Sequence, residues 1–591
     1  MAPSPRSAIL ALLLAASPAL AGGSPEVQLC LQHLKPSERE QAEKAIGSVE
    51  ELPLYRVQLE VDPAKREVKG RVQVEVLAKK RTISELFLRV TPNASGRKVT
   101  ISDAKIDGQP ATLERPEPTL IRVPVNPPVE PGAGVKLEVS LLATVPRAKA
   151  NTGSLLGALG ASGPPGDYGA FSATPEFLSL VGIVPMMPPL NEDGTPWAGP
   201  SGIGDLALYD LSNVVGTITV PSGWKVHATG VAMGEVPEKT FGVRFSFAAA
   251  LVRDFPVFVS KGYESTSKTV NGVTVESFYS SRNAAVGKRV LKYTASALET
   301  FEQKLGALPY KYFRVVEAPL SDGAGGMEFQ GLITVGTSLY RGAADPNSIF
   351  EGAPGMDMFK EMMQQMQQMG MGQQGGASPF DGITKTLERT LEFTVAHEVA
   401  HQYFAGLVGT DPIKDPVADE ALTQYAAVLY FEWAHGKEAA ESLRQEALVA
   451  AYQMYRMMGG PDGSALRPTE EYESSMEYGA IVYGKAPLFF HAARKLMGDE
   501  AFFRGLRSYV DTYRYKWACL DCARKELAKA SSGRSGALER LQDRWWKEPH
   551  GDEDLGTMSM ESLMGASMGD MKLDKETQKM MEDLLKGLSG Q

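Results

Sequence analysis

A short motif places an acid between two metal-binding side chains. His397, Glu398 and His401 form the pattern His-Glu-x-x-His. Because an α-helix turns once in about 3.6 residues, histidines four residues apart share one helix face and can bind the same metal ion. The glutamate between them is placed to act as a general base on a water molecule beside that metal. The motif therefore predicts a zinc-dependent hydrolase.

The residues before the motif predict the helix that this chemistry needs. Residues 383–396 include neither glycine nor proline. Leu387, Leu391, Val395 and Val399 recur at four-residue steps, which is the spacing of an apolar helical stripe. A helix with two buried, hydrogen-bonded histidines and no metal is the alternative. The chain has only seven histidines, and the placement of two of them in this frame favours a metal site.

A third metal ligand is expected in a second helix. A catalytic zinc ion commonly takes three protein ligands and leaves a fourth position for water. Asp415 and Pro416 suit the N-cap and the first turn of a helix that we expect to end near Ala434. The helical pattern alone leaves open which downstream glutamate is the ligand: Glu420, Glu432 or Glu438.

The apolar pattern changes from strands to helices along the chain. Tyr55–Val61 and Val68–Val76 alternate polar and apolar residues, which predicts two strands joined by a turn. Similar short segments with glycine and proline between them continue to about residue 262. Helical periodicity begins with 286–305, strands and loops return at 311–336, and helical patterns then continue to about residue 547. A β-rich domain is therefore expected to precede a mostly helical one.

The N-terminus has the features of a signal peptide. Arg6 is followed by an apolar run from Ala8 to Ala16 and by Ala19-Leu20-Ala21, a small-x-small cleavage site. We expect residues 1–21 to be removed and the protein to be periplasmic or secreted. An uncleaved N-terminal anchor is the alternative. No later stretch predicts a membrane-spanning helix, so the mature protein should lack an integral membrane segment.

Length and charge limit the other possibilities. The 591 residues are too many for one core and predict two or three domains. The net charge of −10 and the lack of a basic cluster argue against a nucleic-acid partner. In chain order, we predict a signal peptide (1–21), a leader (22–50), an N-terminal β domain (51–262), a catalytic domain (263–547) with an insertion at 343–380, and a flexible Met-rich tail (548–591).

The insertion and one pair of cysteines remain open to interpretation. Residues 343–380 are rich in methionine and glutamine, which suggests a mobile segment, a cuprous-ion site or an adaptable contact surface. Cys519 and Cys522 form a C-x-x-C pair, which in an oxidising compartment predicts a local disulfide. Two free thiols or a second zinc site are the alternatives.

Three ordered motifs resemble the aminopeptidase N family of gluzincin metallopeptidases. The first is the His-Glu-x-x-His motif followed, after eighteen residues, by Glu420. The second is Gly325-Gly326-Met327-Glu328-Phe329, which is similar to the family's G-A-M-E-N motif. The third is Val482-Tyr483-Gly484-Lys485-Ala486, which is similar to its Y-x-K-G segment. Weaker similarity covers residues of about 50–545.

The resemblance implies a role for each matching residue. It implies one Zn²⁺ per chain, with His397, His401 and Glu420 as its ligands. It makes Glu398 the general base and Tyr483 the hydrogen-bond donor to the oxyanion of the intermediate. The implied substrate-binding residues are Glu328 and, by a weak match, Glu176 for the free α-amine, with Gly325, Gly326 and Met327 along the substrate backbone.

The resemblance also implies a fold and an activity. We expect a multidomain α+β protein in which a β-rich sandwich or saddle domain precedes a thermolysin-like, mostly helical catalytic domain. The expected activity is removal of N-terminal residues from peptides that have a free N-terminus. A gluzincin endopeptidase and an inactive scaffold or binding protein are the alternatives. The chain departs from the family pattern at Phe329, which replaces an asparagine, and at Gly326, which replaces an alanine.

Overall fold

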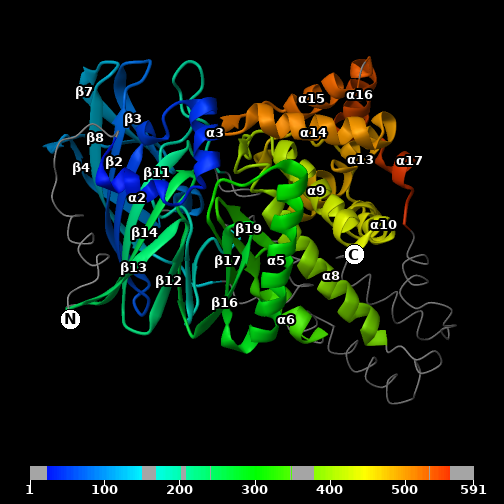
Figure 1. Cartoon of the computed structure of the whole chain (residues 1–591), viewed down its shortest axis with the longest axis horizontal. Coiled ribbons are helices and arrows are strands. Elements are labelled where there is room, and N and C mark those ends of the chain that lie inside the picture. Colours follow the sequence, from blue (N-terminus) through cyan, green and yellow to red (C-terminus); the bar gives the residue numbers. More distant parts are fainter. Residues whose placement is uncertain are drawn as a thin grey trace.

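The chain folds into a β-rich part and a helical part that lie side by side (Figure 1). The computed structural model describes residues 23–558 except 97, 149–167, 201–207, 240, 347, 349–378 and 532. The predicted signal peptide, most of the insertion and most of the tail lie outside the described residues. The predicted fold class, with a β-rich region first and a mostly helical region after it, is confirmed.

Three sheets build the β-rich part. The largest has the order β13-β14-β11-β1-β2-β8-β4-β5. Its strands are β1 (Leu54–Asp62), β2 (Glu67–Leu77), β4 (Val99–Ile106), β5 (Gln109–Pro110), β8 (Gly134–Thr144), β11 (Ser212–Val220), β13 (Val231–Glu238) and β14 (Gly242–Val252). The two smaller sheets contain β3 (Ile83–Arg89), β7 (Leu120–Val129) and β6 (Glu114–Glu117), and β12 (Trp224–Ala228), β15 (Val257–Lys261), β10 (Phe177–Leu180) and β9 (Phe171–Ala173).

Alternating side chains explain how the largest sheet packs. In β1, Val57, Leu59 and Val61 are buried, whereas Gln58 and Glu60 between them are exposed. This strand pairs antiparallel with β2 over its whole length, so the predicted pair of strands is confirmed. One face of the sheet therefore covers the core, and the other faces water.

A five-stranded mixed sheet begins the second part. Its order is β16-β17-β18-β20-β19, which leaves β19 at an edge. The strands are β16 (Tyr263–Val270), β17 (Val273–Ser280), β18 (Tyr312–Ala318), β19 (Gly326–Phe329) and β20 (Leu332–Gly336). Helix α5 (Ala284–Leu305), predicted at 286–305, packs against β16 and β17 and also contacts α8 (Pro379–Ala400).

Helices and π-helical turns make up the rest of the second part. They are α6 (Thr337–Ala344), α8, α9 (Val417–His435), α10 (Lys437–Leu443), η6 (Arg444–Val449), α11 (Ala450–Met457), α12 (Ser475–Tyr478), η8 (Gly479–Lys485), α13 (Leu488–Met497), α14 (Asp499–Tyr513), α15 (Cys522–Ala530), α16 (Ser535–Gln542), η9 (Asp543–Lys547) and α17 (Gly551–Leu555). Two very short strands, β21 (Val408–Gly409) and β22 (Lys516–Trp517), pair parallel among them. Cys519 forms a disulfide with Cys522, the first residue of α15.

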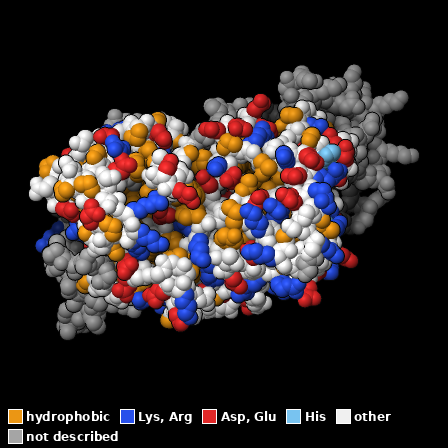
Figure 2. Space-filling view, turned by 90° about the horizontal axis from the view of Figure 1, so that it is seen from above, with side chains coloured by type: hydrophobic (Ala, Val, Ile, Leu, Met, Phe, Trp, Pro, Cys, Tyr) orange, Lys and Arg blue, Asp and Glu red, His pale blue; other side chains and the backbone are white. Residues whose placement is uncertain are grey.

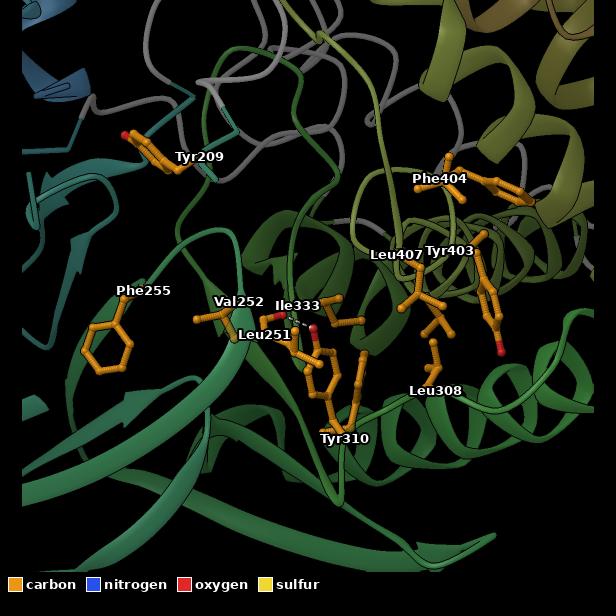
Figure 3. Packing of buried hydrophobic residues seen from close by; sticks show 14 of the residues in the cluster. Tyr209, Leu251, Val252, Phe255, Leu308, Tyr310, Ile333, Tyr403, Phe404 and Leu407 are labelled. Atoms are coloured by element: carbon orange, nitrogen blue, oxygen red, sulfur yellow. Dashed lines mark hydrogen bonds between the residues drawn. The ribbon is translucent and has the colours of Figure 1, made fainter. Parts of the chain in front are cut away.

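The two parts share one continuous hydrophobic core. Figure 3 shows Leu251 from the end of β14 beside Tyr310, whose hydroxyl donates to the Leu251 carbonyl at 2.7 Å. Tyr403 and Leu407, which follow the metal-binding motif, belong to the same buried cluster. Each large apolar side chain buried in this way contributes about 1.5–3 kcal/mol, so the contact between the parts is a substantial stabilising interface.

A polar segment that sequence patterns assign to a simple leader also joins the two parts. Residues 25–46, here called the N-terminal strap, form helices α2 (Pro25–Leu31) and α3 (Pro36–Ile46). Helix α2 packs on β11 and β14, with the Cys30 thiol 3.4 Å from the Val214 carbonyl. On the other side of the strap, Glu38 forms a buried ion pair with Arg514 at 2.7 Å. The strap therefore spans the boundary between the β-rich and helical parts.

The surface mixes charges of both signs. On the face seen in Figure 2, lysine and arginine side chains are interspersed with aspartate and glutamate. Within the described ranges, every helix is too short or too polar to cross a bilayer.

A buried histidine in β12 predicts loss of stability in mild acid. His227 is hydrogen-bonded to Ser260 at 2.8 Å, and burial lowers its pKa to about 3. Because the unfolded histidine has a pKa of about 6.5, the unfolded chain binds more protons below that value, and stability falls as the pH drops. From pH 7 to pH 5 this group should cost about 2 kcal/mol. His227→Gln should make the urea unfolding midpoint less dependent on pH between pH 5 and pH 7. An unchanged dependence on pH would contradict this prediction.

Candidate active site

Helix α8 and the turn after it carry the metal-binding motif. His397 and Glu398 lie in the last turn of α8, which ends at Ala400. His401 begins the following turn, but its backbone N–H still donates to the His397 carbonyl at 3.1 Å. The helical spacing of the two histidines is therefore kept, although the helix ends one residue before the predicted motif does.

The two histidines and Glu420 converge on one point. The Nε2 atoms of His397 and His401 are 3.0 Å apart. Oε2 of Glu420 lies 3.3 Å from the first and 3.4 Å from the second. All three side chains are buried, and among the described residues they are the one group with metal-ligand spacing. Two ring nitrogens and one carboxylate oxygen thus lie within reach of a single ion.

This arrangement fits a zinc ion. Zinc bonds to histidine nitrogen and carboxylate oxygen are about 2.0–2.2 Å long, so a tetrahedral ion separates neighbouring ligand atoms by about 3.3–3.6 Å. The Glu420 Oε2 atom accepts no hydrogen bond from the described residues. Nδ1 of His401 lies 3.1 Å from the Phe404 carbonyl, which can only accept a hydrogen bond. A proton on Nδ1 would satisfy this carbonyl and leave the Nε2 lone pair available to a metal.

Glu398 lies against the edge strand β19. Its carboxyl group is buried, and a Cβ atom added to Gly326 would stand 2.4 Å from its Cδ and Oε1 atoms. Burial raises the pKa of Glu398 well above its ordinary value, and the nearby charge of Glu328 raises this pKa further. A cation bound close by would favour the ionised carboxylate again.

Strand β19 separates its side chains between the site and a hydrophobic cluster. Burial raises the pKa of Glu328, the nearby charge of His401 lowers it, and that of Glu420 raises it. Phe329, the next residue, is buried in a cluster with Phe258 and Leu332, and Met327 packs against this cluster. The replacement of asparagine by Phe329 therefore fills a core beside the site.

Tyr483 lies beside the metal ligand His397. It lies in η8, and its ring centroid is 5.9 Å from that of His397 and 5.5 Å from that of Tyr478. The structure thus brings together the residues of all three sequence motifs, which are far apart in the chain.

A family comparison matches the segment that carries these residues. The model of the peptidase family M1 domain matches residues 380–545. Residues 380–545 form a peptidase family M1 domain. Proteins of this family in the structural comparison are zinc metallopeptidases, which implies zinc as the metal for His397, His401 and Glu420.

Solved structures show the same fold over a longer range. A mutant M1 zinc metallopeptidase from Deinococcus radiodurans has 17% identity and a TM-score of 0.56, over 84% of this chain and 94% of that one. The same enzyme without the mutation has 16% identity and a TM-score of 0.56, and the match again covers 84% of this chain and 94% of that one. A third structure is the mutant bound to a Tyr-Ser-Ala substrate. It has 16% identity and a TM-score of 0.53, also over 84% of this chain and 94% of that one. No curated protein sequence matches the chain.

The geometry of the M1 domain selects one glutamate from the three candidates. Glu432 forms a double ion pair with Arg494, at 2.6 and 2.8 Å. Glu438 is exposed on α10. Glu420 alone of the three joins the histidines.

The predicted N-cap of the helix that carries Glu420 is wrong. Helix α9 begins at Val417, and Pro416, already in helical conformation, occupies the cap position. The chain turns earlier than predicted, through a hydrogen bond from the Asp415 N–H to the Asp411 carbonyl.

Glu176 lies in a different environment from the other predicted residues. It stands in the turn between β9 and β10, where both carboxylate oxygens accept from Arg282 at 2.9 Å. The Glu176 side chain is 52% exposed. Its role in binding an α-amine stays a prediction, and the ion pair with Arg282 would have to open for it to be fulfilled.

Two residues that sequence reasoning missed support the M1 domain site. Gln402 directly follows the motif, and its amide donates to the Phe329 carbonyl and accepts from Gly331 N–H, both at 2.9 Å. It therefore fixes the turn between β19 and β20 relative to the end of α8. Asp419 is buried beside Glu420 and accepts from the Glu420 backbone N–H at 2.9 Å. Their positions next to known motif residues were the only signal in the sequence.

Proposed function

We propose that this chain is an exported zinc aminopeptidase that removes single residues from peptides with a free N-terminus. The carrying observation is the position of Glu328. This carboxylate interacts electrostatically with the metal ligands and lies on the same edge strand as Gly326, which touches Glu398. A peptide carbonyl near the metal would therefore bring its own α-ammonium close to a half-buried carboxylate. Residues 1–21 support export.

The substrate backbone can be held by strand pairing. Strand β19 is an edge strand of its sheet, so a peptide can extend the sheet along Gly325, Gly326 and Met327. One structural neighbour is bound to a Tyr-Ser-Ala substrate, which supports a peptide as the ligand class. Pairing of the peptide backbone with β19 would hold the scissile bond beside Glu398 without contacts to most of the substrate's side chains.

The proposed reaction needs three side chains besides the metal ligands. Zinc, when bound by His397, His401 and Glu420, polarises the scissile carbonyl and acidifies water. Glu398 takes a proton from the attacking water and returns it to the leaving amine. Tyr483 donates a hydrogen bond to the carbonyl oxygen as negative charge develops there. Glu328 fixes the α-ammonium, so that a blocked N-terminus lacks its partner.

The general test is hydrolysis of a panel of aminoacyl chromogenic amides with and without a zinc chelator. We expect cleavage that the chelator abolishes and added zinc restores. Cleavage of internal bonds in N-acetylated peptides, with none of the amides, would instead favour the endopeptidase alternative. Stoichiometric zinc binding without any cleavage would favour a scaffold. Fractionation of cells expressing the full chain tests export.

Removing Glu328 should erase the preference for a free N-terminus. Glu328→Ala is expected to lower kcat/KM for free aminoacyl substrates by about 10- to 100-fold, because a charge-assisted hydrogen bond contributes roughly 1.5–3 kcal/mol. Cleavage of N-acetylated analogues should not fall. Glu176→Ala is the matched comparison, since Arg282 already neutralises Glu176. If Glu176→Ala gave the larger loss of kcat/KM, Glu176 rather than Glu328 would be the residue that binds the α-amine.

A further inference from the structure

Lys485 is a buried charge with no role in the proposed reaction. Its side chain has no exposed surface, and it lies two residues after Tyr483 in the same π-helical turn, η8. Residues two apart on a helix project to roughly opposite sides. Tyr483 faces the metal ligands, and Lys485 points away from them into the helical part of the molecule.

Every proton of the Lys485 ammonium has an acceptor. Nζ donates to Asp462 Oδ1 at 2.7 Å, to the Gly463 carbonyl at 3.1 Å and to the Glu548 carbonyl at 2.8 Å. An ammonium group has three donors, so this set is complete. Burial lowers the pKa of Lys485, and the hydrogen bond to Asp462 opposes this effect. The side chain is therefore held at one place from three directions.

The acceptors belong to segments that are themselves tied together. The second oxygen of Asp462 accepts from the Gly551 N–H at 2.8 Å. The Trp546 indole donates to the Ala486 carbonyl at 3.0 Å, and the Ala465 N–H donates to the Trp546 carbonyl at 2.7 Å. Residues 462–465 and 546–551 thus enclose the C-terminal end of η8, and Lys485 is the charged link among them.

We propose that Lys485 is a positioning residue for Tyr483. By anchoring the end of η8 to Asp462, Gly463 and Glu548, it sets where the Tyr483 hydroxyl stands relative to the substrate carbonyl. This inference rests on the proposed function, because it takes Tyr483 as the hydrogen-bond donor to that oxygen. A π-helical turn is rare and is usually kept for a functional reason.

The burial of a charge at this place supports positioning over simple stability. A buried ion pair rarely stabilises a fold more than apolar side chains of the same volume would. It does demand one arrangement, because any shift of η8 leaves donors or acceptors without partners. Tyr483 must be placed to within a fraction of an ångström to donate to a developing oxyanion.

A double-mutant cycle tests the inference. Lys485→Gln should lower kcat about 10- to 100-fold with KM changed by less than about twofold, because a displacement of about 1 Å can cost that much. In a Tyr483→Phe background the same change should lower kcat by less than about twofold, since the group it positions is gone. Lys495→Gln, an exposed lysine on α13, is the matched control and should leave both constants unchanged.

The outcomes separate this inference from the proposed function. A Lys485→Gln effect that is equally large in the Tyr483→Phe background, or no effect at all, would overturn the inference alone. If Tyr483→Phe did not lower kcat, both the inference and the role of Tyr483 would fall; an inactive wild-type protein would remove the whole proposal. Should Lys485→Gln not fold, Asp462→Asn keeps an acceptor oxygen for the lysine, and the same cycle and the same outcomes apply.

Discussion

Replacing Glu398 by glutamine should lower kcat for an aminoacyl amide by about a thousandfold while zinc stays bound. A general base contributes roughly 10²- to 10⁴-fold, and an amide cannot take up the proton. Glutamine has nearly the same volume, and Glu398 is not one of the three residues in the ligand set. The measurements are kcat on the amide panel and zinc content by elemental analysis.

The control for this variant lies on the same helix. Glu392 is a buried carboxylate in α8 that accepts hydrogen bonds from Tyr430 at 2.8 Å and His435 at 2.9 Å. Glu392→Gln changes the same functional group without touching the site, and it should keep kcat within a few-fold of wild type. Activity of Glu398→Gln within tenfold of wild type would mean that another group takes the proton.

Gly326→Ala should lower kcat/KM by about 100-fold with little loss of stability. The added methyl carbon would stand 2.4 Å from Cδ and Oε1 of Glu398, well inside van der Waals contact. Because the obstructing atoms are the end of a side chain, Glu398 rather than the backbone must move. A shift of about 1 Å in a reacting group can cost about 100-fold in rate, whereas the fold loses little.

The neighbouring glycine offers a matched comparison. A Cβ atom at Gly325 would lie 3.2 Å from a methyl carbon of Thr394 and would not reach Glu398. Gly325→Ala should therefore keep most of the activity. Both variants are compared by kcat/KM and by the thermal unfolding midpoint. A fully active Gly326→Ala enzyme would show that Glu398 works equally well from another rotamer, and would make the close contact with strand β19 unimportant.

Much of the site could be predicted because its key spacing is local. His397 and His401 are one helical turn apart, so the pattern itself states their geometry. Glu420 needed a family resemblance, because the pattern could not separate it from Glu432, whose partner Arg494 comes from another helix. The contact between Gly326 and Glu398 joins segments more than seventy residues apart, and no local pattern reports such a contact.

The fold divides in the same way. Alternation in β1 and β2 predicted their pairing, since one face of that sheet must be apolar. The N-terminal strap escaped prediction because α3 is polar on most of its surface and is fixed by single long-range contacts. The start of α9 was wrong for a related reason: Asp415 satisfies the usual N-cap preference, but a preceding turn had already set the backbone there.

The N-terminal strap imposes an order on synthesis. Glu38 and its partner Arg514 are 476 residues apart in the chain. At a translation rate of about 5–20 residues per second, the ribosome needs about half a minute to a minute and a half to make the partner after the strap has emerged. During that time α3 has no completed docking surface, and the nascent chain cannot reach its final form. A protein whose N-terminal strap must wait for Arg514 stays incompletely folded until its C-terminal helices are made, which is compatible with the export proposed above.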